Sequence, residues 1–96
     1  MKYRKKPVVI DAVQCAEIIR CMTNDWNGLS DWVKNAYEKG EIRAITSQGF
    51  TCGTLEGPLQ AIKTDMIIQG VKGEIYPCKL DIFMATYEPV EFSEKQ

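Results

Sequence analysis

Residues 65–87 constrain the fold more than any other stretch, because they hold two strands, a tight turn and a helix within a few residues. Residues 66–69 and 74–78 are rich in β-forming side chains, and residues 70–73 between them read Gly-Val-Lys-Gly. Two glycines in this four-residue connection supply the positive φ angles that a hairpin turn requires. The stretch therefore predicts a β-hairpin whose pairing ends at Pro77.

The chain after this hairpin predicts a short helix. Four apolar residues recur there at helical spacing: Leu80, Phe83, Met84 and Tyr87. Such spacing is typical of an amphipathic helix, here of about two turns. We expect the hairpin and the helix to form one compact unit, whose core the rest of the chain completes.

The segments before this unit predict a strand, two helices and a β-meander. Residues 8–14 are apolar on both pleat faces, which predicts an inner strand that is buried on both sides at the centre of the sheet. Apolar residues at helical spacing predict two helices, over residues 15–22 and 31–39. Alternating apolar residues and intervening turns then predict three strands, over residues 42–47, 50–55 and 59–62.

Short connections between about six predicted strands indicate antiparallel pairing. We therefore predict a single α+β domain over residues 1–96, in which a bent antiparallel sheet or half-barrel carries two to three short helices. A chain of 96 residues is long enough for one hydrophobic core and too short for two. After the last helix we expect residues 88–92 to be extended.

The composition excludes several classes of protein. It is 45% hydrophobic and 26% charged with a net charge of −1, which indicates an ordinary globular domain and gives no attraction for a DNA or RNA polymer. No apolar run approaches the ~20 residues that span a bilayer. The basic N-terminus leads into Pro7 and a strand, not into the apolar segment of a signal peptide. We expect a cytoplasmic protein that contacts no membrane.

The chemistry of the side chains argues against an enzyme. The sequence contains no histidine, which removes the commonest general base and the commonest metal ligand. The four cysteines lie far apart without a Cys-x-x-Cys pair: Cys15, Cys21, Cys52 and Cys78. We expect reduced structural thiols, no metal, no cofactor and no catalytic residues.

Aromatic rings and basic side chains remain as candidates for a binding site, because they stack on a base and pair with phosphate. The candidate ligand-binding residues are Tyr3, Arg4, Lys6, Trp26, Trp32, Tyr76 and Lys79. Arg4, Lys6 and Lys79 are the expected phosphate partners. We place the site where the basic N-terminal arm reaches the segment after the hairpin.

Most of these residues also have a purely structural interpretation. The basic arm can be a solubilising flank, and Trp26 can cover the edge of the core. Tyr76 can pack in the core while the stem of Lys79 lies over it. The sequence leaves these alternatives open.

Three segments resemble a widespread family of small phage-encoded proteins: residues 1–14, 54–57 and 65–88. The most specific part reads Gly-Val-Lys-Gly-Glu-Ile-Tyr-Pro-Cys-Lys over residues 70–79. The chain departs from the family at residues 63–66, where the family often has Pro-Gly-Asp and an aromatic residue, and at Leu80, where it often has proline. An aromatic side chain that lines a pocket in relatives is then missing here.

The resemblance implies a phage origin, and phage proteins of this size include sponges that sequester nucleotide second messengers of bacterial antiviral defence. It implies an immune-evasion protein in the host cytoplasm that binds a cyclic dinucleotide or an ADP-ribose-derived signal without cleaving it. We expect a homo-oligomer, a dimer or tetramer, because a subunit interface supplies a second wall to the site. The alternative is a structural or protein-interaction module of a phage that inhibits or scaffolds a protein partner.

Overall fold

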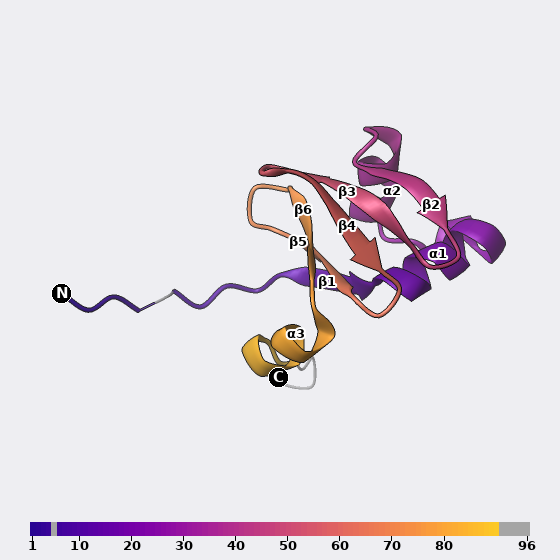
Figure 1. The fold of residues 1–96 in the computed structure, drawn as a ribbon. Helices are drawn as coiled ribbons and strands as arrows, with labels where there is room; N and C mark the ends of the chain where they lie inside the picture. The colour runs from indigo at the N-terminus through magenta and orange to yellow at the C-terminus, as the bar shows by residue number, and fades with distance from the viewer. Residues whose placement is uncertain (5, 91–96) are drawn as a thin grey trace.

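The structure is a computed structural model that describes residues 1–4 and 6–90 (Figure 1). In these residues the chain forms the strands β1 (Asp11–Gln14), β2 (Ile42–Thr46), β3 (Gly49–Thr54), β4 (Gly57–Ile62), β5 (Met66–Gln69) and β6 (Ile75–Cys78). The helices are α1 (Cys15–Asn24), the 3₁₀ turn η1 (Trp26–Gly28), α2 (Asp31–Glu38) and α3 (Leu80–Thr86). Among the helices described, none is long and apolar enough to cross a membrane.

The strands form two three-stranded antiparallel sheets, with the orders β1-β5-β6 and β2-β3-β4. The predicted fold class is confirmed: the chain is α+β with about six antiparallel strands, and the sheets do not close into a barrel. The predicted hairpin is β5–β6, in which Gly73 has a φ of 87° and donates its N–H to the carbonyl of Gly70 at 3.0 Å. The predicted meander is β2-β3-β4. Residues 91–92 of the predicted C-terminal extension lie outside the described residues.

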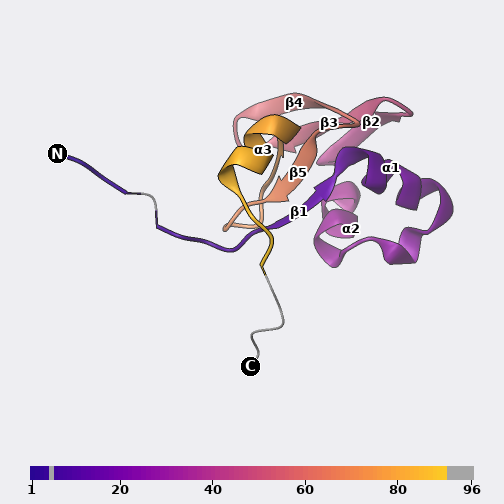
Figure 2. The ribbon, with the colours of Figure 1, turned by 90° about the horizontal axis from the view of Figure 1, so that it is seen from below.

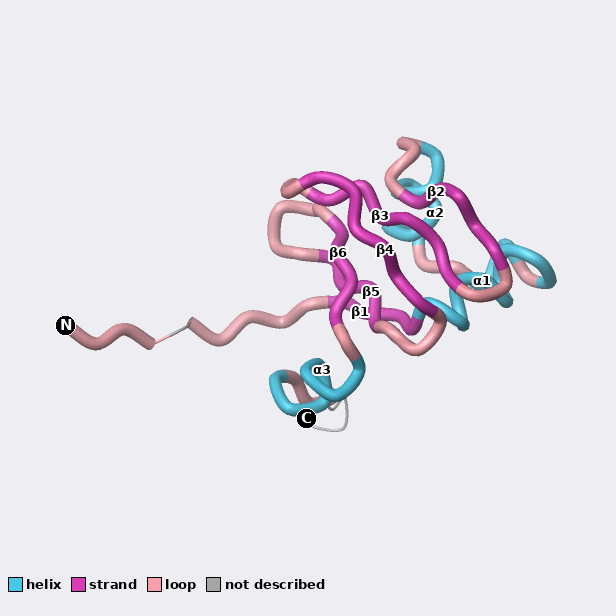
Figure 3. Tube along the Cα trace, viewed as in Figure 1, coloured by secondary structure: helices cyan, strands magenta, loops and turns pink. Residues whose placement is uncertain are grey.

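The first strand lies at the edge of its sheet, so the prediction of a central strand buried on both sides is wrong. In the described residues β1 pairs only with β5, from Asp11↔Gln69 to Gln14↔Met66. Residues 1–4 and 6–10 extend away from the body as a loop, on the side opposite α1 and α2 (Figures 2 and 3). The apolar pattern of residues 8–14 is that of a central strand, but in the part of the chain that the structure describes no second strand pairs with it.

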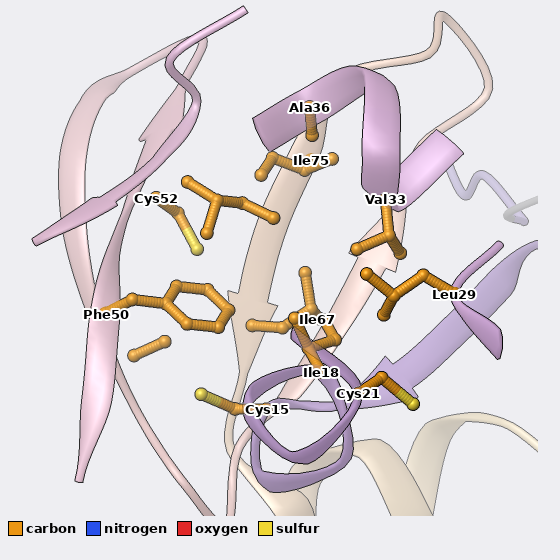
Figure 4. Packing of buried hydrophobic residues seen from close by; sticks show 12 residues of the cluster. Cys15, Ile18, Cys21, Leu29, Val33, Ala36, Phe50, Cys52, Ile67 and Ile75 are labelled. Carbon is orange, nitrogen blue, oxygen red and sulfur yellow. The ribbon is translucent and has the colours of Figure 1, made fainter. Parts of the chain in front are cut away.

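The main core lies between the two sheets and helices α1 and α2 (Figure 4). Each helix turns one apolar stripe inward, as its spacing predicts. Burying one large apolar side chain stabilises a fold by about 1.5–3 kcal/mol, so this cluster supplies most of the driving force for folding. Its buried members are Cys15, Ile18, Cys21, Leu29, Val33, Ala36, Ile42, Phe50, Cys52, Ala61, Ile67 and Ile75.

Helix α3 covers the opposite face of the β1-β5-β6 sheet. Successive residues of a strand point to opposite faces, so Ile68 faces away from Ile67 and the main core. Ile68 is buried nonetheless, and its register partners are Ala12 on β1 and Tyr76 on β6. Figures 1 and 2 both show α3 beside this sheet and apart from α1 and α2. The sheet is therefore covered on both faces.

The turn at residues 63–65 holds the two sheets and α1 together. The N–H of Lys63 donates to the carbonyl of Gln48 at 2.9 Å, at the β2–β3 turn. The N–H of Cys15, the first residue of α1, donates to the carbonyl of Asp65 at 2.8 Å. These bonds satisfy backbone groups that a buried junction leaves without water.

Candidate binding groove

A groove of about 580 Å³ lies between the base of the N-terminal arm and α3, and we call it the arm–α3 groove. Binding sites for small molecules have volumes of about 300–1,000 Å³ and mostly apolar walls with a few polar groups. The arm–α3 groove fits both criteria. Its lining residues are 8–12, Met66, Phe83, Met84, Tyr87 and 88–90.

Aromatic rings set the chemistry of this groove. The ring centroids of Phe83 on α3 and of Tyr87 just after it lie 5.1 Å from each other with a tilt of 31°. Glu88 also lines the groove, and no salt bridge in the described residues reaches it. Asp11 borders the groove, but its side chain shares the face of Ile67, which points to the main core, and so lies on the face of the sheet opposite α3. A planar ligand can stack on the rings while its N–H and O–H groups donate to the Glu88 carboxylate, whose charge disfavours a phosphate inside the groove.

The basic arm carries three of the predicted site residues, Tyr3, Arg4 and Lys6, and all three are exposed. An extended chain advances ~3.3 Å per residue, which places Lys6 ~7 Å and Arg4 ~13 Å along the chain from Val8, where the groove begins. Lys6 is thus the predicted phosphate partner nearest to the groove. Tyr3 and Arg4 extend away from it within one chain (Figure 1).

Tyr76 interacts with α3 and does not line the arm–α3 groove. Burial, followed by a hydrogen bond with Tyr87, raises the pKa of Tyr76 to about 12. Residue Tyr76 also borders a second hollow of about 380 Å³, together with Leu55 and Leu59. Tyr76 is half-buried beside Tyr87 and is not among the residues of the main core, so its role in ligand binding stays a prediction.

Lys79 has an internal partner. Its Nζ atom lies 3.3 Å from Oδ1 and 3.4 Å from Oδ2 of Asp65, a carboxylate that is 2% exposed. The Oδ2 atom also accepts the N–H of Ile62 at 2.9 Å. Lys79 can act as a phosphate partner only if this pair opens.

The two tryptophans lie in the helical part of the molecule, away from the arm. Trp26 in η1 meets Tyr37 edge to face, with centroids 5.6 Å apart and an angle of 73°. It lines a hollow of about 390 Å³ with Met22 and Ile45. Trp32 on α2 packs against the main core. One chain therefore does not bring the seven predicted site residues together.

The cysteines offer no nucleophile near neutral pH. Cys15, Cys21 and Cys52 are buried, Cys78 is half-buried, and all are free thiols. Burial raises the pKa of Cys15 to about 11, with the Asp65 carboxylate adding to the effect, and burial raises the pKa of Cys52 to about 12. The residues that the structure describes contain no cluster of three or more metal-ligating side chains.

None of the seven predicted ligand-binding residues lines the arm–α3 groove. The groove borders the base of the arm and the segment after the hairpin, but a ligand site at this place stays a prediction. Helical spacing predicts Phe83 and Met84 as apolar residues of α3, and it does not tell which apolar residues face a hollow. No pattern in the sequence singles out Asp11 or Glu88.

Comparisons with known proteins find no match for this chain. No protein family, no curated protein and no solved structure shows detectable similarity to it.

Proposed function

We propose that this protein binds a nucleotide-derived second messenger of bacterial antiviral defence in the arm–α3 groove and holds it without cleaving it. In this role it is a phage immune-evasion protein that acts in the host cytoplasm by sequestration. The observation that carries the proposal is the groove itself, which combines a ligand-sized volume of about 580 Å³ with an aromatic wall and a carboxylate residue, Glu88.

The groove suits the base and the ribose of such a ligand. A base that stacks on an aromatic side chain gains ~1–3 kcal/mol, as judged by alanine substitution in other proteins. Glu88 can accept hydrogen bonds from base amino groups or ribose hydroxyls. Its charge also repels phosphate, which favours a pose with the phosphates outside the groove, on the side of Lys6. A cyclic dinucleotide and an ADP-ribose derivative both have the base, ribose and phosphate that this pose needs.

Binding without cleavage is supported by the few catalytic groups at the groove. Cleavage of a glycosidic bond commonly uses a pair of carboxylates, and cleavage of a phosphodiester commonly uses a bound metal. Of the two carboxylate residues that border the groove, Asp11 has its side chain on the other face of the sheet, and the described residues contain no cluster of three or more metal-ligating side chains. The resemblance to small phage-encoded proteins supplies the biological setting of the proposal.

A second candidate function is a protein-interaction module that inhibits or scaffolds a protein partner. It is favoured by exposed apolar side chains on α3, of which Ile82 is 56% and Met84 68% accessible. Exposed apolar surface can mark a protein-binding site. This candidate needs no small ligand.

Thermal melting with a panel of cyclic dinucleotides and ADP-ribose derivatives separates the two candidates. A ligand at ~100 times its Kd raises the free energy of unfolding by ~2.7 kcal/mol, which raises the Tm of a domain of this size by about 10 °C or more. The ligand is then recovered by denaturing the complex and analysed by chromatography. The proposal predicts a shift for at least one panel member and its recovery intact. No shift at millimolar concentration, or recovery of a cleaved product, contradicts the proposal.

A further inference from the structure

The outer edge of β1 is a sheet edge that the described residues leave unpaired. Val8, Val9 and Ile10 continue β1 as an extended segment, and within the described residues their backbone groups make no hydrogen bond. The side chains of Val8 and Val9 are 46% and 77% exposed. Natural proteins protect free edges with charges, bulges or proline, because an open apolar edge pairs readily with another strand. Pro7 and Asp11 flank residues 8–10, which themselves carry none of these features.

We propose that the free edge of β1 pairs antiparallel with the same edge of a second copy of this chain, about a two-fold axis at Ile10. Residues 6–14 of the two copies then form the central strands of one continuous six-stranded sheet, with the order β6-β5-β1-β1-β5-β6 across the two copies. Identical edges pair only antiparallel about an axis perpendicular to the sheet, so the contact is isologous and closes as a dimer. The net charge of −1 does not oppose this association.

Charge complementarity identifies the second copy as the occupant of the edge. Gln14, Met66 and Cys78 form one row across the sheet, and α3 begins just after Cys78 with Asp81 in its first turn. Pairing about Ile10 places Lys6 of one copy opposite Gln14 of the other, at this end of the sheet. The face of Gln14 is also that of Ala12, the face that α3 covers. Lys6 thus comes onto the α3 side of the other copy, and the exposed Asp81 is the anionic partner proposed for it there.

Each chain carries these opposite charges but does not bring them together itself. Within residues 1–4 and 6–90, neither the cations of the arm nor Asp81 makes a salt bridge. The arm extends away from α3 within one copy (Figure 1). Antiparallel pairing turns the arm of each copy onto the surface of the other.

The register is restricted by Asp11. An axis at Asp11 would place two carboxylates directly opposite each other, which destabilises an antiparallel pair. An axis at Ile10 places Val9 opposite Asp11 and Val8 opposite Ala12. Because the axis is perpendicular to the sheet, both α3 helices and both arm–α3 grooves then lie on the same side of the dimer.

Substitutions at Val9 test the contact and its register through the molar mass in solution. Equilibrium sedimentation without ligand should give a dimer of twice 10.9 kDa for the natural chain. In Val9→Glu the new carboxylate of each copy lies opposite Asp11 of the other, and these two repulsive pairs should weaken association roughly tenfold. Val9→Lys places a cation opposite Asp11 and should not weaken association. The control Val71→Glu changes a valine of similar exposure, 73%, in the β5–β6 turn and should leave the mass unchanged.

A charge exchange tests the proposed pair of Lys6 and Asp81. Lys6→Glu and Asp81→Lys should each weaken the dimer several-fold, and the double variant should recover most of the loss, since coupling of this kind marks a direct interaction. Ile10→Cys should also form a disulfide between copies on mild oxidation, because opposite Cα atoms of paired strands lie within disulfide range. A natural chain that stays monomeric at 100 µM, or a dimer that Val9→Glu and the charge changes leave intact, overturns the proposal. These masses are measured without nucleotide, so they are independent of the proposed ligand.

Discussion

The ammonium group of Lys79 lies 3.3 Å from the Oδ1 atom of Asp65. The N-cap residue of α3 therefore forms a salt bridge with the carboxylate at the junction of the two sheets. The side chain of Asp65 is 3% exposed, and that of Lys79 is 59% exposed. Asp65 also accepts the N–H of Ile62 and, through its backbone carbonyl, the N–H of Cys15. The pair thus connects α3 to the turn on which β4, β5 and α1 meet.

Removing the cation should therefore destabilise the fold. In Lys79→Ala the buried carboxylate keeps the N–H of Ile62 but loses its charged partner, and an unsatisfied buried acceptor costs about 1–3 kcal/mol. We expect a loss of this size in the free energy of unfolding measured with urea. Lys79→Arg, which keeps the charge, should lose less.

Lys72→Ala is the matched control for this substitution. Lys72 is an exposed lysine in the β5–β6 turn whose side chain makes no hydrogen bond or salt bridge with the described residues. Its removal should change the free energy of unfolding by less than ~0.5 kcal/mol. Equal stability of Lys79→Ala and Lys72→Ala would show that the pair does not stabilise the junction.

The thiols should react in a fixed order. Cys78 is half-buried, whereas Cys15, Cys21 and Cys52 are buried, so a thiol reagent at pH 8 should label Cys78 first in the folded protein. All four thiols should react quickly in denaturant. Mass spectrometry of peptides after brief labelling gives the order, and early labelling of Cys52 would contradict the buried position of β3.

Alkaline pH should destabilise the protein through the same thiols. The pKa of Cys15 in the folded state is raised from 9.0 to about 11, so the folded chain holds its proton where the unfolded chain has lost it. The stabilising contribution is complete below pH ~9 and is lost as the pH rises toward 11, with a slope of up to ~1.4 kcal/mol per pH unit. Urea unfolding between pH 8 and 10.5 measures the slope, and Cys15→Ala should reduce it. An identical slope in the variant would exclude Cys15 as a source.

Tyr76 should titrate at higher pH than an ordinary tyrosine. Burial and the hydrogen bond with Tyr87 raise the pKa of Tyr76 to about 12, and Tyr87→Phe removes the second cause. We expect the absorbance of tyrosinate to show a lower pKa for Tyr76 in Tyr87→Phe, with Tyr3→Phe as a control that leaves the Tyr76 pKa unchanged. The same pKa in both variants would contradict the contact between α3 and β6.

The fold was largely predictable because its signals are local. The glycines of the β5–β6 turn, the helical spacing of α1 and α2 and the alternation in β2 all act within a few residues of the chain. The position of β1 was not predictable in this way. Residues 8–10 have the apolar character of a buried strand, and only the three-dimensional arrangement shows that they extend beyond the body of the chain.

The candidate binding residues were less predictable than the fold, because their availability depends on which long-range contacts they make in the folded chain. Lys79 has the charge of a phosphate partner, but its pairing with Asp65 depends on a contact over 14 positions in the sequence. Trp26 has the ring of a stacking platform, yet it meets Tyr37 within the helical layer. Residue type alone could not tell whether such a side chain binds a ligand or makes a contact within the fold.

One tight approach of two strands gives a test of the β3–β4 register. A Cβ atom at Gly49 would collide with the backbone carbonyl oxygen of Ala61, whereas a Cβ at Gly53 would mainly meet the flexible end of the Arg43 side chain. Gly49→Ala should therefore lower the free energy of unfolding by about 1–3 kcal/mol, and Gly53→Ala should cost clearly less. Equal losses in the two variants would argue against this register.

The most direct test of the proposed function is calorimetric titration of the natural chain and two charge variants with the nucleotide that stabilises it most. Met84→Glu adds a carboxylate at the wall of the arm–α3 groove, and Val71→Glu adds one in the β5–β6 turn; the two side chains are 68% and 73% exposed. Both variants should fold with the stability of the natural chain. The proposal predicts that Met84→Glu weakens nucleotide binding at least tenfold and that Val71→Glu leaves it unchanged. Equal affinities of the natural chain and Met84→Glu would contradict binding in the groove.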